Sequence, residues 1–122
     1  MGRIRKFDES IAIPAARAVF AERGYSGTSI DELTARTGML RGSLYGAFGS
    51  KMGLFRACAE SILKNLDPNS PDAVNFLVVA LKDVGRGDPV IESYCKQHVA
   101  ALGTNPALTL GEVLLTNIDE TR

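Results

Sequence analysis

The chain has 122 residues, 45% hydrophobic and 23% charged, which is typical of a folded globular protein with room for one domain or a small domain plus an appendage. Fourteen Lys and Arg balance fourteen Asp and Glu, so the net charge is zero. Residues 1–56, however, hold nine basic and five acidic side chains, whereas residues 57–122 hold five basic and nine acidic ones. No apolar run approaches the roughly 20 residues of a membrane span. Two cysteines and one histidine are too few for a disulfide framework or a multi-histidine metal site. We therefore expect a cytoplasmic protein with no membrane association and no cofactor, in which the basic and acidic halves have different tasks.

Helical patterns dominate, and the first follows a basic arm at residues 1–7. Apolar side chains at three- and four-residue spacing predict a helix from Asp8 or Ser10 to Arg23, ended by Gly24 in a left-handed conformation. Pro14 fits the first turn if the helix starts at Ser10, whereas a start at Asp8 implies a kink. The predicted buried stripe comprises Ile11, Ala12, Ala15, Ala16, Val19 and Phe20.

A capping box predicts where the second helix begins. Ser29 with Glu32 forms the box, and Thr28 with Asp31 is the alternative frame. Gly38 ends this short helix. The turn and the two helices that follow are predicted over 38–40, 41–48 and 51 to about 66.

A polar segment with two prolines, residues 67–72, is the clearest linker. Three more helices are predicted beyond it, over 72–84, 89 to about 102 and 106–118. A strand is the competing interpretation of Phe76–Leu81, but the apolar run is longer than a strand needs. The last helix carries an apolar stripe that we expect to mediate dimerisation, formed by Val113, Leu114, Leu115 and Ile118.

The first three helices form a helix-turn-helix unit. Its third helix must enter a DNA major groove about 12 Å wide, so its outward face must be small or polar. Arg41 can pair with a guanine edge or a phosphate, Gly42 lets the backbone approach, and Ser43 can reach either target. Leu44 and Phe48 are expected to hold the opposite face on the core.

Further candidates for phosphate contacts surround this helix. Tyr45 can place its hydroxyl on a phosphate. Thr28 and Ser29 offer hydroxyls and backbone N–H groups at the start of the second helix, and Lys51 has the same position at the fourth.

Two motifs extend across these helices: Phe20-x-x-x-Gly24-Tyr25-x-x-Thr28-Ser29-Ile30, and Thr37-Gly38-x-x-Arg41-Gly42-Ser43-Leu44-Tyr45-x-x-Phe48-x-x-Lys51-x-x-Leu54-Phe55. Over about residues 7–66 the chain thereby resembles the TetR family of transcriptional regulators. The resemblance implies a homodimer that binds a palindromic operator, usually as a repressor, and is released by a small-molecule effector. It also implies that residues 51–66 connect effector and DNA sites. The matched DNA-facing positions are Thr28, Arg41, Gly42, Ser43, Leu44, Tyr45 and Lys51.

We therefore expect an all-α protein with a helix-turn-helix domain and connector helix at 7–66, the helix-turn-helix itself at about 29–48. A shortened helical region for regulation and dimerisation is expected at 71–122. The predicted function is that of a sequence-specific, ligand-responsive regulator binding a double-stranded DNA operator as a homodimer, and not that of an enzyme. The alternative is a truncated interaction protein without effector response.

Candidate effector contacts lie in the connector and beyond it. Cys58 and Cys95 are expected to be buried thiols, with a redox sensor as the alternative. His98 is expected on a helix surface or partly buried, with a polar anchor for an effector as the alternative. The candidates for effector contact are Cys58, Ile62, Phe76, Tyr94 and His98.

Overall fold

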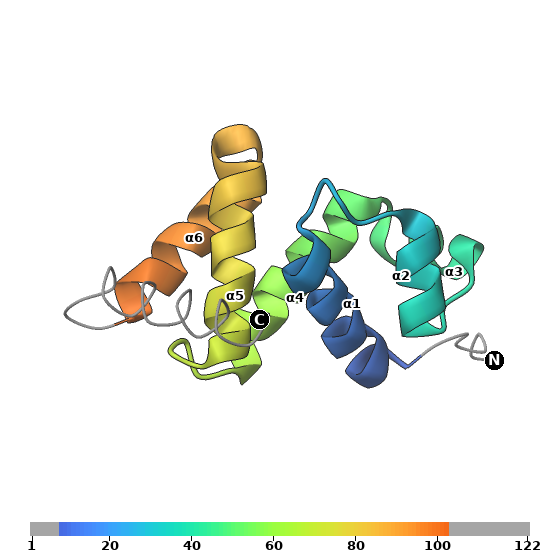
Figure 1. Ribbon diagram of the computed structural model, residues 1–122, viewed down its shortest axis with the longest axis horizontal. Helices are drawn as coiled ribbons and strands as arrows, with labels where there is room; N and C mark the ends of the chain where they lie inside the picture. Colours follow the sequence, from blue (N-terminus) through green and yellow to red (C-terminus); the bar gives the residue numbers. More distant parts are fainter. Residues whose placement is uncertain (1–7, 103–122) are drawn as a thin grey trace, which may run out of the picture. The chain divides into compact units, whose positions relative to one another are not determined.

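The computed structural model describes residues 8–102, with the side chain of Arg86 excepted, and every regular element within them is helical (Figure 1). In chain order these are α1 (Glu9–Arg23), α2 (Ile30–Thr37), α3 (Arg41–Phe48), α4 (Lys51–Asn65), α5 (Pro71–Val79), the π-helical turn η1 (Ala80–Val84), the 3-10 turn η2 (Gly85–Gly87) and α6 (Pro89–Ala101). The all-α fold is confirmed, as is a helix over Phe76–Leu81. The basic arm and the apolar stripe expected at residues 113–118 lie outside the described residues.

The chain divides within α4 into two compact units, unit 1 (Met1–Cys58) and unit 2 (Ala59–Arg122). Unit 1 contains α1, α2, α3 and the start of α4, and unit 2 contains the rest of α4 and the later helices. Within residues 8–102, no helix has both the length and the apolar character needed to cross a membrane.

The cap at Asp8 fixes the start of α1. Its Oδ1 accepts a hydrogen bond from the Ser10 backbone N–H at 2.9 Å, so Pro14 lies inside the helix, on an exposed side. Ile11 was predicted in the buried stripe, and this is wrong, because its side chain is 65% exposed. The stripe runs through Ala12, Ile13, Ala16, Val19 and Phe20, which leaves residue 11 at its edge.

The chain leaves α1 through Gly24, whose φ of 78° is positive as expected. Its ψ of 168° is extended, so the predicted left-handed helical conformation is not adopted. Beyond it, three aromatic rings hold α1, the following loop and α4 together. Phe20 and Phe55 meet edge to face at 4.9 Å between centroids, and Tyr25 meets Phe55 in the same way at 5.1 Å.

The turn between α2 and α3 has a fixed geometry. Ser29 caps α2 by accepting the Glu32 backbone N–H at 3.0 Å, which confirms the first of the two predicted capping frames. Gly38 ends α2 in the left-handed conformation, with φ of 77°. The next residue, Met39, is 2% exposed and donates its backbone N–H to Thr37 Oγ1 at 3.1 Å. This buried methionine and hydrogen bond set the direction in which α3 begins.

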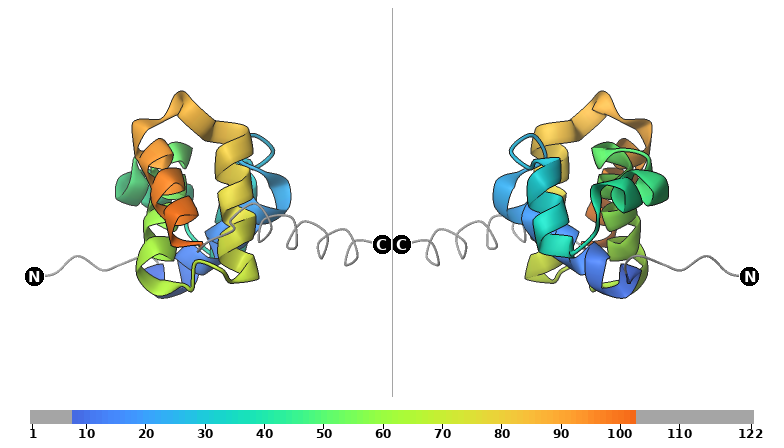
Figure 2. Two further views of the ribbon diagram at one scale, coloured as in Figure 1. Left: turned by 90° about the vertical axis from the view of Figure 1, so that its left-hand side faces the viewer. Right: turned by 90° about the vertical axis from the view of Figure 1, so that its right-hand side faces the viewer.

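In unit 2, α5 and α6 are joined at one end by η1 and η2 (Figure 2). Ser70 caps α5, and the Asp88 side chain caps α6 by accepting the Ile91 backbone N–H at 3.0 Å. Proline occupies the first position of both helices, where its missing N–H has no intrahelical role. Phe76 of α5 and Tyr94 of α6 meet edge to face at 5.9 Å.

Candidate nucleic-acid interface

One side of α3 is buried and the opposite side is open to solvent. Leu44 is fully buried, as its predicted packing role requires, so its side chain is not presented to solvent. Phe48, one turn further on, is partly buried. The exposed residues of the helix are Arg41, Gly42, Tyr45, Gly46 and Ala47, and Ser43 is partly exposed.

The glycines of this region differ in what surrounds them. At Gly27 and Gly53, an added Cβ would collide with the carbonyl oxygens of Arg23 and Phe48 respectively, so the packing of the protein itself requires glycine. At Gly42 and Gly46, an added Cβ would meet nothing within 4 Å. Glycine inside a helix is less favourable than alanine by roughly 0.5–1 kcal/mol. The space that a side chain would occupy at positions 42 and 46 is therefore open, and packing within the described part of the chain does not require glycine there.

Arg41, the first residue of α3, is held by a carboxylate from α2. Its Nη1 donates to Asp31 Oδ1 at 2.8 Å. The two side chains are 60% and 90% exposed, so the pair lies at the surface and solvent screens it strongly. A guanidinium has five N–H donors, and others remain for an outside acceptor. The contact therefore orients the guanidinium without using all of its donors.

Lys51, the first residue of α4, is anchored to the loop before α2. Its Nζ donates to the carbonyl oxygens of Tyr25 and Thr28, both at 3.0 Å, and lies 4.3 Å from the centre of the Tyr25 ring. An ammonium has three donors, so two are engaged within the protein and one remains.

The two hydroxyls before α2 have different environments. Thr28 is 2% exposed, and its hydroxyl donates to the Gly24 carbonyl at 2.6 Å, so its single proton is not presented to a phosphate. Ser29 is exposed, and its oxygen accepts from Glu32 while its own proton remains available. The Thr28 side chain therefore stabilises the loop between α1 and α2 through its hydrogen bond to Gly24.

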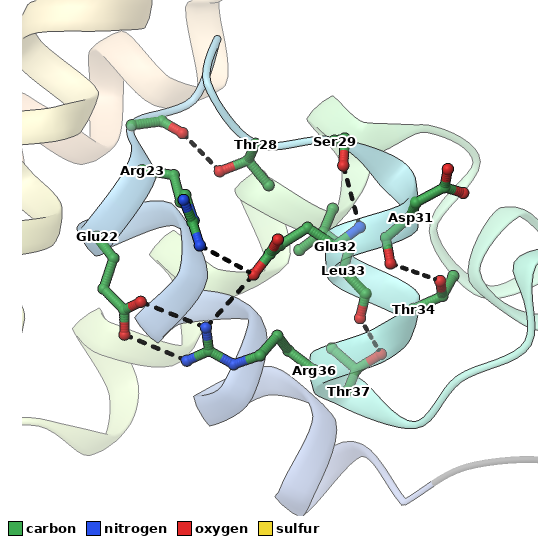
Figure 3. Close-up of polar contacts among 11 residues, drawn as sticks. Glu22, Arg23, Thr28, Ser29, Asp31, Glu32, Leu33, Thr34, Arg36 and Thr37 are labelled. Atoms are coloured by element: carbon green, nitrogen blue, oxygen red, sulfur yellow. Dashed lines mark hydrogen bonds and ion pairs between the residues drawn. The ribbon is translucent and has the colours of Figure 1, made fainter.

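A network of charges braces α2 against α1 (Figure 3). Arg36 donates to both carboxylate oxygens of Glu22, at 3.3 and 3.2 Å. Glu32 lies 3.5 Å from Arg36 and 3.6 Å from Arg23. The hydrogen bond from Arg36 holds the pKa of Glu22 below its ordinary value of 4.5. The bidentate contact joins α2 to α1 at the surface of unit 1.

Three of the five candidate effector contacts form one cluster in unit 2. The Tyr94 hydroxyl lies 3.1 Å from His98 Nδ1, and His98 Nε2 lies 2.8 Å from the Pro68 carbonyl oxygen. Because a carbonyl only accepts, Nε2 carries a proton and, in the neutral ring, Nδ1 accepts from Tyr94. His98 is fully buried, so the expectation of a surface or partly buried position is wrong. Its ring joins α6 to the linker, and Phe76 packs on the Tyr94 ring.

The other two candidates, Cys58 and Ile62, are also buried. The Cys58 Sγ lies 3.8 Å from the Ile13 carbonyl oxygen, and burial raises the pKa of this thiol to about 12. Burial also raises the pKa of Cys95. Both cysteines are free and buried, as expected, and raised pKa values disfavour the redox-sensor alternative. In the described residues, no group of His, Cys, Asp or Glu side chains could hold a metal ion.

Two features of the α3 surface were not predicted. Asp31 was considered only as a possible helix cap, because its contact with Arg41 crosses a turn and has no local spacing rule. Gly46 received no role, although it follows Gly42 at the four-residue spacing that places two residues on one helix face. The four-residue spacing of Gly42 and Gly46 in the sequence could have identified Gly46 as part of the same helix face.

Comparison with known proteins identifies relatives of this segment. Residues 12–58 match the model of the family described as bacterial regulatory proteins, tetR family. The chain is 41% identical over 64 residues to the uncharacterized HTH-type transcriptional regulator YezE of Bacillus subtilis (strain 168), and 46% identical over 54 residues to the HTH-type transcriptional repressor BdcR of Escherichia coli (strain K12). These matches cover 52% and 44% of this chain, but only 33% and 27% of the relatives. The HTH-type transcriptional repressor ComR of E. coli K12 is 41% identical over 56 residues, covering 46% of this chain and 27% of ComR.

Proposed function

We propose that this chain, which belongs to the tetR family of bacterial regulatory proteins through residues 12–58, binds a specific DNA operator with α3 and represses transcription there. The observation that supports this most directly is the outward face of α3. Gly42 and Gly46 leave open space on that face, and the exposed Arg41 and Tyr45 border it. Because these two glycines carry no side chain, the helix backbone can approach the base edges closely, and the side chains of Arg41 and Tyr45 can reach bases and phosphates.

Each exposed group has a proposed role that its surroundings support. Arg41, oriented by Asp31, contacts a guanine edge or a phosphate. The hydroxyls of Tyr45 and Ser29 contact phosphates, and the remaining proton of Lys51 does the same. These contacts fix the register of α3 on the duplex, whereas those to base edges provide the specificity.

Three residues predicted from the sequence complete the proposed interface with different roles. Ser43, partly exposed, reaches a base or a phosphate. Leu44 holds α3 on the core, and Thr28 positions the Lys51 anchor through its backbone carbonyl.

The finer part of the proposal concerns assembly and control. As the family resemblance implies, two copies bind a palindromic operator with their α3 helices about 34 Å apart, or a multiple of that distance. An effector bound by unit 2 would release the DNA. The protein would act in the cytoplasm, where its two free thiols stay reduced.

A regulator or interaction protein without effector response remains the second candidate, and one observation favours it. Tyr94 and His98 are buried and bonded to one another, and His98 also to the Pro68 carbonyl. These polar groups therefore already serve the fold of unit 2, where an effector site would need them.

Selection from a pool of random duplexes, combined with a mass measurement in solution, tests both candidates. Enrichment of one sequence with two-fold symmetry by a dimer would support the proposal. Arg41→Ala should weaken binding to the enriched duplex by roughly five- to 150-fold, from about 1–3 kcal/mol for a lost bidentate base contact. The matched control is Lys96→Ala, which removes an exposed cation from α6. Failure to enrich any sequence would refute the proposed function.

A further inference from the structure

Leu40 exposes an apolar side chain at the start of the helix proposed to read DNA. Its side chain is 63% exposed, and its extended backbone, with φ of −75° and ψ of 151°, makes it the N-cap residue of α3. Its carbonyl accepts the Leu44 backbone N–H at 2.9 Å, so the backbone performs the capping role. The leucine side chain makes no capping hydrogen bond.

The other N-caps of the described chain show what this position normally provides. The caps of α1, α2, α5 and α6 are Asp or Ser side chains, and each accepts a hydrogen bond from a backbone N–H of its helix. Leucine is among the poor residues at an N-cap, so its presence destabilises α3 relative to serine or aspartate. Single exposed leucines are common on protein surfaces. Leu40 supplies no side-chain cap, is exposed and directly precedes Arg41, so its side chain is available to a partner outside the protein.

We propose that Leu40 contacts the C5-methyl group of a thymine in the operator and determines specificity at that base pair. This inference rests on the proposed function. In a helix-turn-helix, residues at the N-terminus of the recognition helix contact base edges. The thymine methyl is the apolar group that base pairs present in the major groove. Arg41 supplies polar donors next to Leu40, and the open space at Gly42 allows this end of α3 to approach.

Replacement of single thymines by uracil tests the contact, because uracil lacks only the methyl group. The probe is the duplex enriched by the selection described above, with each thymine of the site replaced in turn. We expect one thymine per half-site at which uracil weakens binding by the parent protein about three- to fivefold, because the complex no longer buries one methyl group. If no replacement weakens binding, the inference is wrong.

Two variants then assign the effect to this side chain. Leu40→Ala should bind the thymine duplex and the uracil duplex with the same affinity, and so should Leu40→Ser. Leu40→Ser also supplies a capping hydroxyl, so loss of folding cannot explain the result. The matched control is Leu81→Ala, which truncates a 44% exposed leucine of η1 and should retain the discrimination of the parent.

The possible failures can be told apart. Discrimination that persists in Leu40→Ser overturns the methyl contact while the proposed function stands. A Leu40 variant that keeps the discrimination but loses self-association, measured by mass in solution, would assign the leucine to a protein interface. If the parent enriches no sequence, the proposed function fails and the contact fails with it.

Discussion

Replacing Gly46 by alanine separates the stability of the fold from its proposed task. The residue lies in α3 with helical geometry, and an added Cβ meets nothing within 4 Å, so the methyl group fits without strain. Removing a helical glycine should stabilise unit 1 by about 0.5–1 kcal/mol. For a domain of 60–100 residues, 1 kcal/mol raises Tm by roughly 4–8 °C. The same methyl group should weaken operator binding, because it keeps α3 away from the groove floor. Overpacking of roughly 1–3 kcal/mol gives about a five- to 150-fold loss.

Urea or thermal unfolding, followed by circular dichroism, measures the first effect, and fluorescence anisotropy with the enriched duplex measures the second. Gly87→Ala is the matched control, since Gly87 is exposed and equally open but lies in η2. It should leave DNA affinity unchanged. A Gly46→Ala protein that is more stable and binds as tightly as the parent would refute the proposed role of this face. A less stable protein would refute the stated reason for the stability gain.

Three further outcomes follow from the contacts of unit 1. Gly53→Ala should lower Tm or prevent folding, measured by circular dichroism, because the new Cβ collides with the Phe48 carbonyl oxygen. Glu22→Gln should have a lower free energy of unfolding than the parent above about pH 4.5. This difference should vanish as the pH falls through the lowered pKa of Glu22, because protonation weakens its pair with Arg36. Urea titrations at a series of pH values test this. Cys58, with its pKa raised to about 12, should resist iodoacetamide at pH 8 until urea unfolds the protein, as mass spectrometry would show.

Features decided by neighbours in the chain could be predicted from the sequence. The Ser29 cap, the end of α2 at Gly38 and the Pro89 start of α6 each depend on a few adjacent residues, and the structure confirms all three. The bounds of α3 follow for the same reason, since a turn precedes it and Gly49 ends it.

Features decided by residues distant in sequence or by orientation could not be predicted. The spacing in α1 indicated a buried stripe but not its edge, so Ile11 was placed on the wrong side of that edge. The motif identified Thr28 as a candidate contact but could not show its hydroxyl turned to the Gly24 carbonyl. The Asp31–Arg41 pair depends on the angle at which α3 leaves its turn, which only the packed structure defines.

The intramolecular partners of the basic side chains bear on how strongly salt should oppose DNA binding. Arg23 and Arg36 lie within ion-pair distance of carboxylates of the protein, and neither is among the proposed DNA contacts. The slope of log affinity against log salt counts the ions released from DNA, about 0.9 for each phosphate neutralised. A cation that keeps its partner within the protein displaces fewer of these ions. The slope should therefore be below what nine basic side chains in residues 1–56 would give. It would report the number of cations that contact the DNA, which is smaller than the number of basic residues in the segment.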